Sequence, residues 1–437
     1  MKTFWAVILA ALFSGCASSP GHFHELALIN ESSAEVKRDL SLQFDAYIVG
    51  IEKDNASRIG RIAECGAGSR TTECVDIDAP YFKERPDLRE GLRGKYAGQH
   101  RPTYVSHVAR FDGTGNVCFL YNIYVSNGLC TETTPVPASP ALVSQSWQAL
   151  SLLGKDIERY VNARNPSHIV VYTMGWNTGQ PEALRNIRDL VSQLRAAAGG
   201  DAAFRPLVIG LTWPSTGTPL VPASDFGIKA KDADEVGALW ENILLNRELR
   251  RAKTQGKFRV VVVGHSFGAR AATRAVFSAP LVSAPLVGAS PPVVDLLVSL
   301  QGAYSFQRYL GGDSDSSEGR EGAPYRDFAT QAGQVVMTAS THDSAVTAAL
   351  HAPYFVGSHR AFSDARTGPG AERFSHVSTD ETGRIDRLVC DSRRVMWIDA
   401  SSIIKGNQPG TGGGAHSVIY TREAGQLLFD LIKACAP

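Results

Sequence analysis

The amino-acid sequence predicts an α/β fold, in which a mostly parallel sheet carries helices on both faces and an antiparallel hairpin forms one edge. Short apolar runs alternate along the chain with segments in which apolar residues recur at helical spacing. Strands that are apolar throughout are typical of a parallel sheet buried on both faces. The hairpin is indicated by two β-rich runs within residues 103–125, which flank the turn sequence DGTGN.

The expected parallel strands are short and follow the hairpin. They cover residues 168–173, 206–213, 258–264, 294–300, 334–340 and 394–400. An earlier run, FDAYIVGIEK at residues 44–53, indicates one further strand, whereas the rest of residues 17–100 has no clear pattern. We therefore divide the chain into a signal segment (1–16), an N-terminal extension of uncertain structure (17–100) and an α/β domain (101–437).

The expected helices lie between these strands. They cover residues 146–162, a segment with Leu184, Ile187, Val191 and Leu194 on its buried face, residues 238–252, the stretch after Gly268, and a last segment with Leu427, Leu428, Leu431 and Ile432. The chain has 437 residues and a formal net charge of +1, so its charge gives no indication of a nucleic-acid partner.

The stretch VVVVGHSFGARAA, residues 260–272, carries the most specific signal. It contains the motif G-x-S-x-G between a buried strand and a helix, which is the context of a nucleophile on a sharp strand-to-helix turn. Gly264 and Gly268 stand two residues before and after Ser266, where a Cβ would strike a neighbouring strand or helix. We therefore interpret Ser266 as a nucleophile; the alternative is a serine in an ordinary tight turn.

From about residue 103 the chain resembles an α/β-hydrolase, in the bacterial branch called α/β-hydrolases of unknown function. The resemblance rests on GHSFGAR at the turn, MGWNTG after the first parallel strand and TWPSTG after the next. It covers roughly three quarters of the chain. It implies an α/β-hydrolase fold with a nucleophile elbow and a triad in the order serine, acid, histidine.

The base and the acid are expected after late strands. His416 lies in the glycine-rich segment GTGGGAHSVIY, between the last expected strand and the last helix, where the fold places its base; the alternative is a surface histidine. Asp343 follows the second strand after the elbow and is the expected acid, with Asp399 as the rival. Asp295 precedes its strand, which argues against it. The remaining histidines that we considered rank below His416, with His265 interpreted as packing: His265, His342, His351, His359 and His376.

Two backbone amides are expected to form an oxyanion hole. One is the amide of Phe267, directly after the nucleophile. The resemblance implies that the other is the amide of Trp176, in the loop that begins Met174-Gly175. Met174 departs from the histidine that is common in the family at this position.

Insertions at about residues 302–333 and 351–380 could cover the site. The second carries Tyr354, Phe355, Phe362 and Phe374, which suit an aromatic lid over an acyl chain; the alternative is that these rings fill local gaps. The sequence has no dinucleotide or phosphate loop, no calcium loop and no zinc helix, so the expected chemistry needs neither cofactor nor metal.

The N-terminal segment MKTFWAVILAALFSGCASSP is typical of a secretory signal. Its LFSGC resembles a bacterial lipobox, although Phe13 stands where leucine is usual. The resemblance implies lipidation of Cys16 and anchoring to a bacterial membrane, with Ala17 favouring the outer one. The alternative is ordinary cleavage and a periplasmic or secreted protein.

Six cysteines follow Cys16, and an even number in an exported protein suggests disulfides. Fifteen pairings are possible. Proximity in the sequence favours Cys65–Cys74 and Cys118–Cys130, which leaves Cys390–Cys435; the alternative is free, buried thiols.

These observations predict a serine hydrolase that cleaves small-molecule or lipid carboxylic esters, esterase-like or lipase-like, through an acyl-enzyme on Ser266. An acyltransferase or amidase would use the same three residues. The alternative of another class is a membrane-anchored binding or scaffold protein on a hydrolase fold that is catalytically silent. The sequence does not indicate the oligomeric state.

Overall fold

The structure is a computed structural model. It describes residues 42–53, 63–64, 74–75, 103–123, 128–131, 142–216, 222–279, 291–310, 325, 328–346, 354–406 and 414–437. The signal segment and Cys16 lie outside the described residues.

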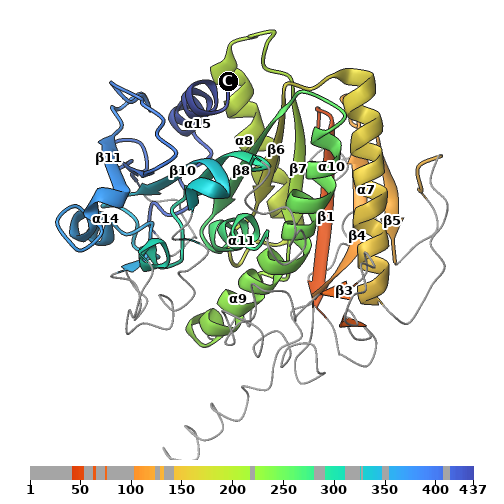
Figure 1. Cartoon of the computed structure of the whole chain (residues 1–437), viewed down its shortest axis with the longest axis horizontal. Helices are drawn as coiled ribbons and strands as arrows, with labels where there is room; N and C mark the ends of the chain where they lie inside the picture. The colour runs from red at the N-terminus through yellow and green to blue at the C-terminus, as the bar shows by residue number, and fades with distance from the viewer. Residues whose placement is uncertain are drawn as a thin grey trace, which may run out of the picture.

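One large sheet organises the described part of the chain (Figure 1). It has ten strands in the order β11-β12-β10-β9-β8-β6-β7-β1-β4-β5. The strands are β1 (Ala46–Lys53), β4 (Thr103–Phe111), β5 (Val117–Asn122), β6 (His168–Thr173), β7 (Pro206–Thr212), β8 (Arg259–His265), β9 (Val294–Leu300), β10 (Ala332–Ala339), β11 (Phe374–Ser378) and β12 (Val395–Asp399). A separate parallel pair joins β2 (Ala63–Glu64) to β3 (Cys74–Val75).

The strand directions confirm the expected mixed α/β sheet. β4 pairs antiparallel with β1 and with β5, and the pairings from β1 through β7 to β11 are all parallel. Every residue of β6 is buried, as is every residue of β8 after Arg259. Such strands bury apolar side chains on both sheet faces, which requires a helical layer on each.

Helices cover both faces of this sheet (Figure 1). On one face lie α7 (Leu142–Arg164), α9 (Pro222–Val236), α10 (Arg250–Lys253) and α11 (Phe267–Val276). On the other, α8 (Gln180–Ala198) packs against α15 (Arg422–Cys435). Shorter helices are α14 (His359–Ala365) and the 3₁₀ turns Phe306–Tyr309, Phe328–Thr330 and Ala371–Arg373.

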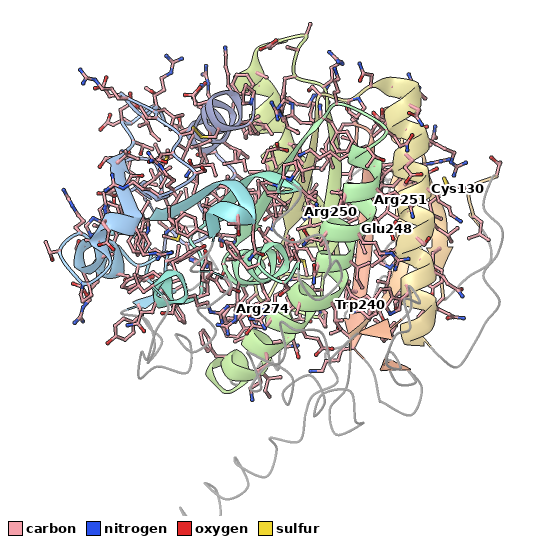
Figure 2. The ribbon with its side chains drawn as sticks, viewed as in Figure 1. Cys130, Trp240, Glu248, Arg250, Arg251 and Arg274 are labelled. Carbon is pink, nitrogen blue, oxygen red and sulfur yellow. A yellow bond between two sulfur atoms is a disulfide. The ribbon has the colours of Figure 1, made fainter. Side chains whose placement is uncertain are left out.

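Two features differ from the expected elements. The helix expected at 238–252 belongs to one continuous helical run from α9 to α10, through π-helical stretches at Gly237–Glu241 and Leu244–Leu249. Trp240, Glu248 and Arg250 lie along this run (Figure 2). The segment 351–380, expected as an insertion, supplies strand β11 at the sheet edge beside β12.

Two disulfides join described cysteines. Cys118–Cys130 joins the start of β5 to the segment at residues 128–131, and Cys390–Cys435 ties the end of α15 to the segment before β12. Both confirm the expected pairs, whereas Cys65 of the third pair lies outside the described residues. The disulfides are consistent with an extracellular or periplasmic location. None of the described helices combines the length and the apolarity that a bilayer span requires.

Candidate active site

The sequence-predicted site residues gather where the parallel strands end. Ser266 directly follows β8, Met174-Gly175-Trp176 follow its neighbour β6, and Asp343 follows β10. The carboxyl ends of parallel strands meet at one edge of a sheet, which is where open α/β sheets form their clefts. The strands therefore bring together loops that are far apart in the sequence.

Ser266 occupies a strained turn between β8 and α11. Its backbone has φ +56° and ψ −122°, a combination that non-glycine residues rarely adopt. A Cβ on Gly264 would lie 2.4 Å from the Cα of Ala269, and one on Gly268 would lie 2.1 Å from the carbonyl oxygen of Thr173. The two glycines thus let strand, turn and helix approach closely enough to hold Ser266 in this conformation.

His416 and Asp343 form a buried pair. Nδ1 of His416 lies 2.7 Å from Oδ2 of Asp343, and the carboxylate is fully buried. The other carboxylate oxygen, Oδ1, accepts hydrogen bonds from the backbone amides of Ala345 and Val346, at 3.1 and 3.3 Å. A buried carboxylate that is hydrogen-bonded on both oxygens has a fixed orientation.

The loop that carries His416 is fastened to the loop that carries Asp343. Gly414 forms a β-bridge with Asp343, and the amide of Ala415 donates to the carbonyl oxygen of His342 at 3.1 Å. Gly414 has φ +64°, and a Cβ there would lie 2.5 Å from Oγ of Ser344. The glycine that precedes this histidine by two residues is therefore required for the two loops to meet.

His265 connects this pair to the turn that carries Ser266. Its Nε2 lies 3.0 Å from the carbonyl oxygen of His416, and the two imidazole rings lie 4.8 Å apart. Burial lowers the pKa of His265 to about 3, so the ring is neutral and donates through Nε2–H. The sequence predicted only a packing role. The structure shows a hydrogen bond that holds the His416 backbone beside Ser266.

His416 contacts His265, the residue before Ser266, and forms no direct hydrogen bond with Ser266. Ser266 and His416 are both nearly buried, at 7% and 9% exposed. Among the described residues, the hydrogen bonds of His416 are those to Asp343 and His265, and none reaches Ser266 Oγ. Serine–histidine contacts are often long in the free state and tighten when substrate binds.

The rival acid Asp399 belongs to a different pair. Its Oδ2 lies 3.2 Å from Nε2 of His359, and its Oδ1 accepts from the amide and hydroxyl of Ser401. It therefore caps the loop after β12 and makes no contact with His416. Asp295 binds Lys253 and Arg259 at the start of β9, away from the strand ends that carry Ser266.

The structure also places two of the other described histidines that were considered as bases. His376 packs between Phe362 and Trp397, and His342 contributes its backbone carbonyl to the loop described above. His351 lies outside the described residues.

The Trp176 loop is fastened to the loop after β7. The indole Nε1–H of Trp213 donates to the carbonyl oxygen of Met174 at 2.8 Å, and the amide of Asn177 donates to that of Ser215 at 3.2 Å. Met174 is fully buried, so the residue that departs from the family pattern serves as packing here. The motifs MGWNTG and TWPSTG thus meet in one hydrogen-bonded unit.

The two expected oxyanion donors stand beside Ser266. A Cβ on Gly175 would lie 3.3 Å from the Cβ of Ser266, so this loop passes directly over the serine. The rings of Trp176 and Phe267 pack on each other with centroids 5.7 Å apart. Among the described residues, neither of their amides donates a hydrogen bond to the protein.

Aromatic rings extend from these two residues. Phe226 of α9 lies 4.9 Å from Phe267 and 5.9 Å from Trp176, and it stacks on Phe355 at 5.9 Å, all between ring centroids. We call these four residues the aromatic wall. Of the rings expected in a lid, Phe355 belongs to this wall, whereas Phe362 and Phe374 pack against Trp397 in the core.

Comparisons with known proteins identify no family for this chain. No protein-family model matches the sequence, and no curated protein matches it. Among solved structures, Trichoderma reesei cutinase in complex with a C11Y4 phosphonate inhibitor matches at 15% sequence identity and a TM-score of 0.19. The match covers 38% of this chain and 67% of that chain. A likeness at this TM-score supports neither a fold nor a function, so both depend on the geometry above.

Proposed function

We propose that the protein is a serine hydrolase with an α/β-hydrolase fold, which cleaves carboxylic esters through an acyl-enzyme on Ser266. One observation carries the proposal. A buried His416–Asp343 pair, 2.7 Å apart, lies beside a serine held at φ +56° between a parallel strand and a helix. A serine hydroxyl needs an adjacent base that a third group orients, and these three residues can supply that arrangement.

In the proposed reaction, Oγ of Ser266 attacks the ester carbonyl carbon as its proton passes to Nε2 of His416. The carboxylate of Asp343 keeps the proton on Nδ1 of that ring and stabilises the imidazolium. The tetrahedral oxyanion accepts hydrogen bonds from the amides of Trp176 and Phe267. When the intermediate collapses, the C–O bond to the alcohol breaks, and His416 returns the proton to the departing oxygen.

Water then releases the acyl group. His416 removes a proton from a water molecule as its oxygen attacks the acyl carbon, and the second tetrahedral intermediate uses the same two amides. Its collapse breaks the bond to Oγ of Ser266, which regains the proton, and a carboxylic acid leaves. No cofactor enters either half of this reaction.

The aromatic wall favours an apolar acyl group. Trp176 and Phe226 are partly exposed, and they lie beside the two residues whose amides would hold the oxyanion. An acyl chain that extends from Ser266 in the acyl-enzyme would lie against these rings. The buried area of such a chain would supply binding energy of about 0.8 kcal/mol per methylene group.

The test is hydrolysis of p-nitrophenyl esters of increasing chain length. We expect Ser266→Ala and His416→Ala to lose at least about three decades of rate, and a fluorophosphonate to label the wild type but not Ser266→Ala. Ser401→Ala is a matched control, because Ser401 also follows a parallel strand and contacts an aspartate that is paired with a histidine. A wild type that neither turns over esters nor takes the label would refute the proposal and favour a binding protein.

We also propose that the protein is exported and anchored through lipidated Cys16 to the bacterial outer membrane. The disulfides Cys118–Cys130 and Cys390–Cys435 support export to an oxidising compartment. Fractionation of cells that express the wild type or Cys16→Ser tests it. We expect the wild type in the outer-membrane fraction and the variant in soluble form, whereas an unchanged distribution would contradict lipid anchoring.

A further inference from the structure

Gln301 is a buried, strained residue at the edge of the candidate site. It directly follows β9, is fully buried, and has φ +48° although it is not a glycine. Non-glycine residues adopt this conformation at a cost, and such strain concentrates at functional sites. The strain directs a long polar side chain from the end of β9 toward the loop after β10.

The side-chain amide of Gln301 has one possible orientation. Its Oε1 accepts from the hydroxyl of Thr338 at 3.0 Å, and the backbone amide of Gln301 donates to the same hydroxyl oxygen at 3.0 Å. Its Nε2 donates to Oδ2 of Asp343 at 2.8 Å. The reversed amide would place its oxygen against the carboxylate oxygen, which is repulsive. The acceptors on the Nε2 side, Asp343 and the carbonyl oxygen of Gly357 at 3.5 Å, therefore fix which end of the amide faces the carboxylate, and Thr338 supports that orientation by donating to Oε1.

Two donors thus converge on one oxygen atom. Oδ2 of Asp343 accepts from Nδ1 of His416 at 2.7 Å and from Nε2 of Gln301 at 2.8 Å. Donors on a carboxylate stabilise its ionised form and spread its charge over more hydrogen bonds. The strength of the contact between Asp343 and a protonated His416 therefore depends on whether Gln301 donates.

We propose that Gln301 is a positioning residue. It orients the Asp343 carboxylate and weakens the interaction of that carboxylate with the protonated imidazole of His416. The proposal rests on the function proposed above only in that His416 serves as the base. Among the described residues, the titratable groups that face His416 are Asp343 and His265, and His265 is kept neutral by burial. Gln301 thereby sets the pH at which His416 gains its proton.

Three variants test this role. Gln301→Met keeps the side-chain length and removes both hydrogen-bonding groups. Thr338→Val removes only the hydroxyl that donates to Oε1 and accepts from the backbone amide of Gln301, and it leaves Asp343 untouched. Gln334→Met is the matched control, because Gln334 is a buried glutamine on β10 that donates to the backbone carbonyls of Val335 and Arg394.

The first measurement is the pH titration of the downfield proton resonance of Nδ1 of His416, which needs no turnover. In Gln301→Met, the carboxylate with one donor fewer holds the imidazolium more strongly. We expect the midpoint to move to higher pH by at least about 0.3 unit, and Thr338→Val to shift it less in the same direction. Gln334→Met should leave it unchanged.

The second measurement is the pH profile of kcat/KM for an ester. Its acid limb should move with the resonance, and kcat should fall about tenfold at unchanged KM. A folded Gln301→Met with the wild-type midpoint would overturn the proposal; if that variant does not fold, a wild-type midpoint in Thr338→Val does so. Shifted resonances in a protein that a fluorophosphonate does not label would retain the role of Gln301 and refute the hydrolase.

Discussion

Two aspartates at the carboxyl edge of the sheet are each paired with a histidine, but their surroundings differ. Asp343 and Asp399 both follow or end a parallel strand, and each is hydrogen-bonded to a histidine. Asp343 is fully buried and is linked through His416 and His265 to the turn that carries Ser266, whereas Asp399 is partly exposed and also binds the loop that follows its own strand. Only the first arrangement can hold an imidazole against Ser266.

We predict that Asp343→Asn lowers kcat for ester hydrolysis by about 10³–10⁴-fold. The amides of Ala345 and Val346 would hold the asparagine oxygen, so its NH₂ group would face Nδ1 of His416. The histidine would then carry its proton on Nε2 and could not accept one from Ser266. Steady-state kinetics on a short-chain p-nitrophenyl ester measure the loss.

The control for this prediction is Asp399→Asn, which removes the equivalent charge from the His359 pair. We expect its kcat to stay close to that of the wild type. Equal losses in the two variants would show that the reaction is sensitive to any charge at this edge of the sheet, and the assignment of Asp343 as the acid would then be wrong.

Among the elements, α15 controls the position of His416 from outside the site. The helix begins six residues after His416, where Thr421 Oγ1 accepts from the amide of Ala424. It packs on α8 so closely that a Cβ on Gly425 would lie 2.7 Å from Gln193. Its last residue, Cys435, is bonded to Cys390. A helix fixed at both ends keeps the preceding loop in register with the Asp343 loop.

We predict that Cys390→Ser with Cys435→Ser lowers the free energy of unfolding more than Cys118→Ser with Cys130→Ser does. The first disulfide closes 45 residues and the second 12. Loop-closure entropy then gives losses of about 4 and about 3 kcal/mol. Urea denaturation of the two double variants measures both. A smaller loss for the longer loop would mean that the unfolded chain already holds α15 near residue 390.

The elements themselves were largely predictable, because apolar runs such as 168–173 and 259–265 are local signals. β11 was not predicted, since its sequence FSHVS is short and only Phe374 is buried. The place of β1 could not be predicted either. Ala46 pairs with Phe111 on one side and with Val208 on the other, and no local pattern specifies such distant partners.

The same limit applied to the site. The positions of Ser266, His416 and Asp343 follow from strand order, which also favoured Asp343 over Asp399, but only the distances show that Asp343 is the one paired with His416. The contribution of Gln301 depends on a positive φ and on the hydroxyl of Thr338 from the next strand. The sequence offered one signal for Gln301: it is a polar residue directly after β9, the strand that pairs with β8.

At the scale of the whole molecule, buried titratable groups make stability depend on pH, and three of them are fully buried and neutral: His107, His265 and Glu241. Burial lowers the pKa of His107 and of His265 from 6.5 to about 3, and it raises the pKa of Glu241 from 4.5 to about 8. Glu241 accepts from the hydroxyl of Thr173 at 2.9 Å, just before the Trp176 loop. All three groups are therefore neutral in the folded protein near pH 6.5.

The free energy of unfolding rises with pH where the unfolded state binds more protons, and it falls where the folded state does. Below pH 6.5 the unfolded histidines bind protons and the folded ones do not, so their contribution to stability is lost as the pH falls toward 3. Glu241 behaves in the opposite way. Its carboxyl is protonated in the folded state and ionised in the unfolded chain, so its contribution is lost as the pH rises from 4.5 to 8. Each proton changes the free energy of unfolding by about 1.4 kcal/mol per pH unit.

We predict that the free energy of unfolding has its maximum near pH 6.5, and that Glu241→Gln removes the decrease on the alkaline side. A glutamine is a neutral substitute for the protonated carboxyl, and its oxygen can still accept from Thr173. Urea denaturation at pH 5, 6.5 and 8 measures the profile. Glu182→Gln, which removes an exposed carboxylate from the first turn of α8, is the control and should keep the wild-type profile. A wild-type stability that instead rises between pH 6.5 and 8, or a decrease that persists in Glu241→Gln, would contradict the prediction.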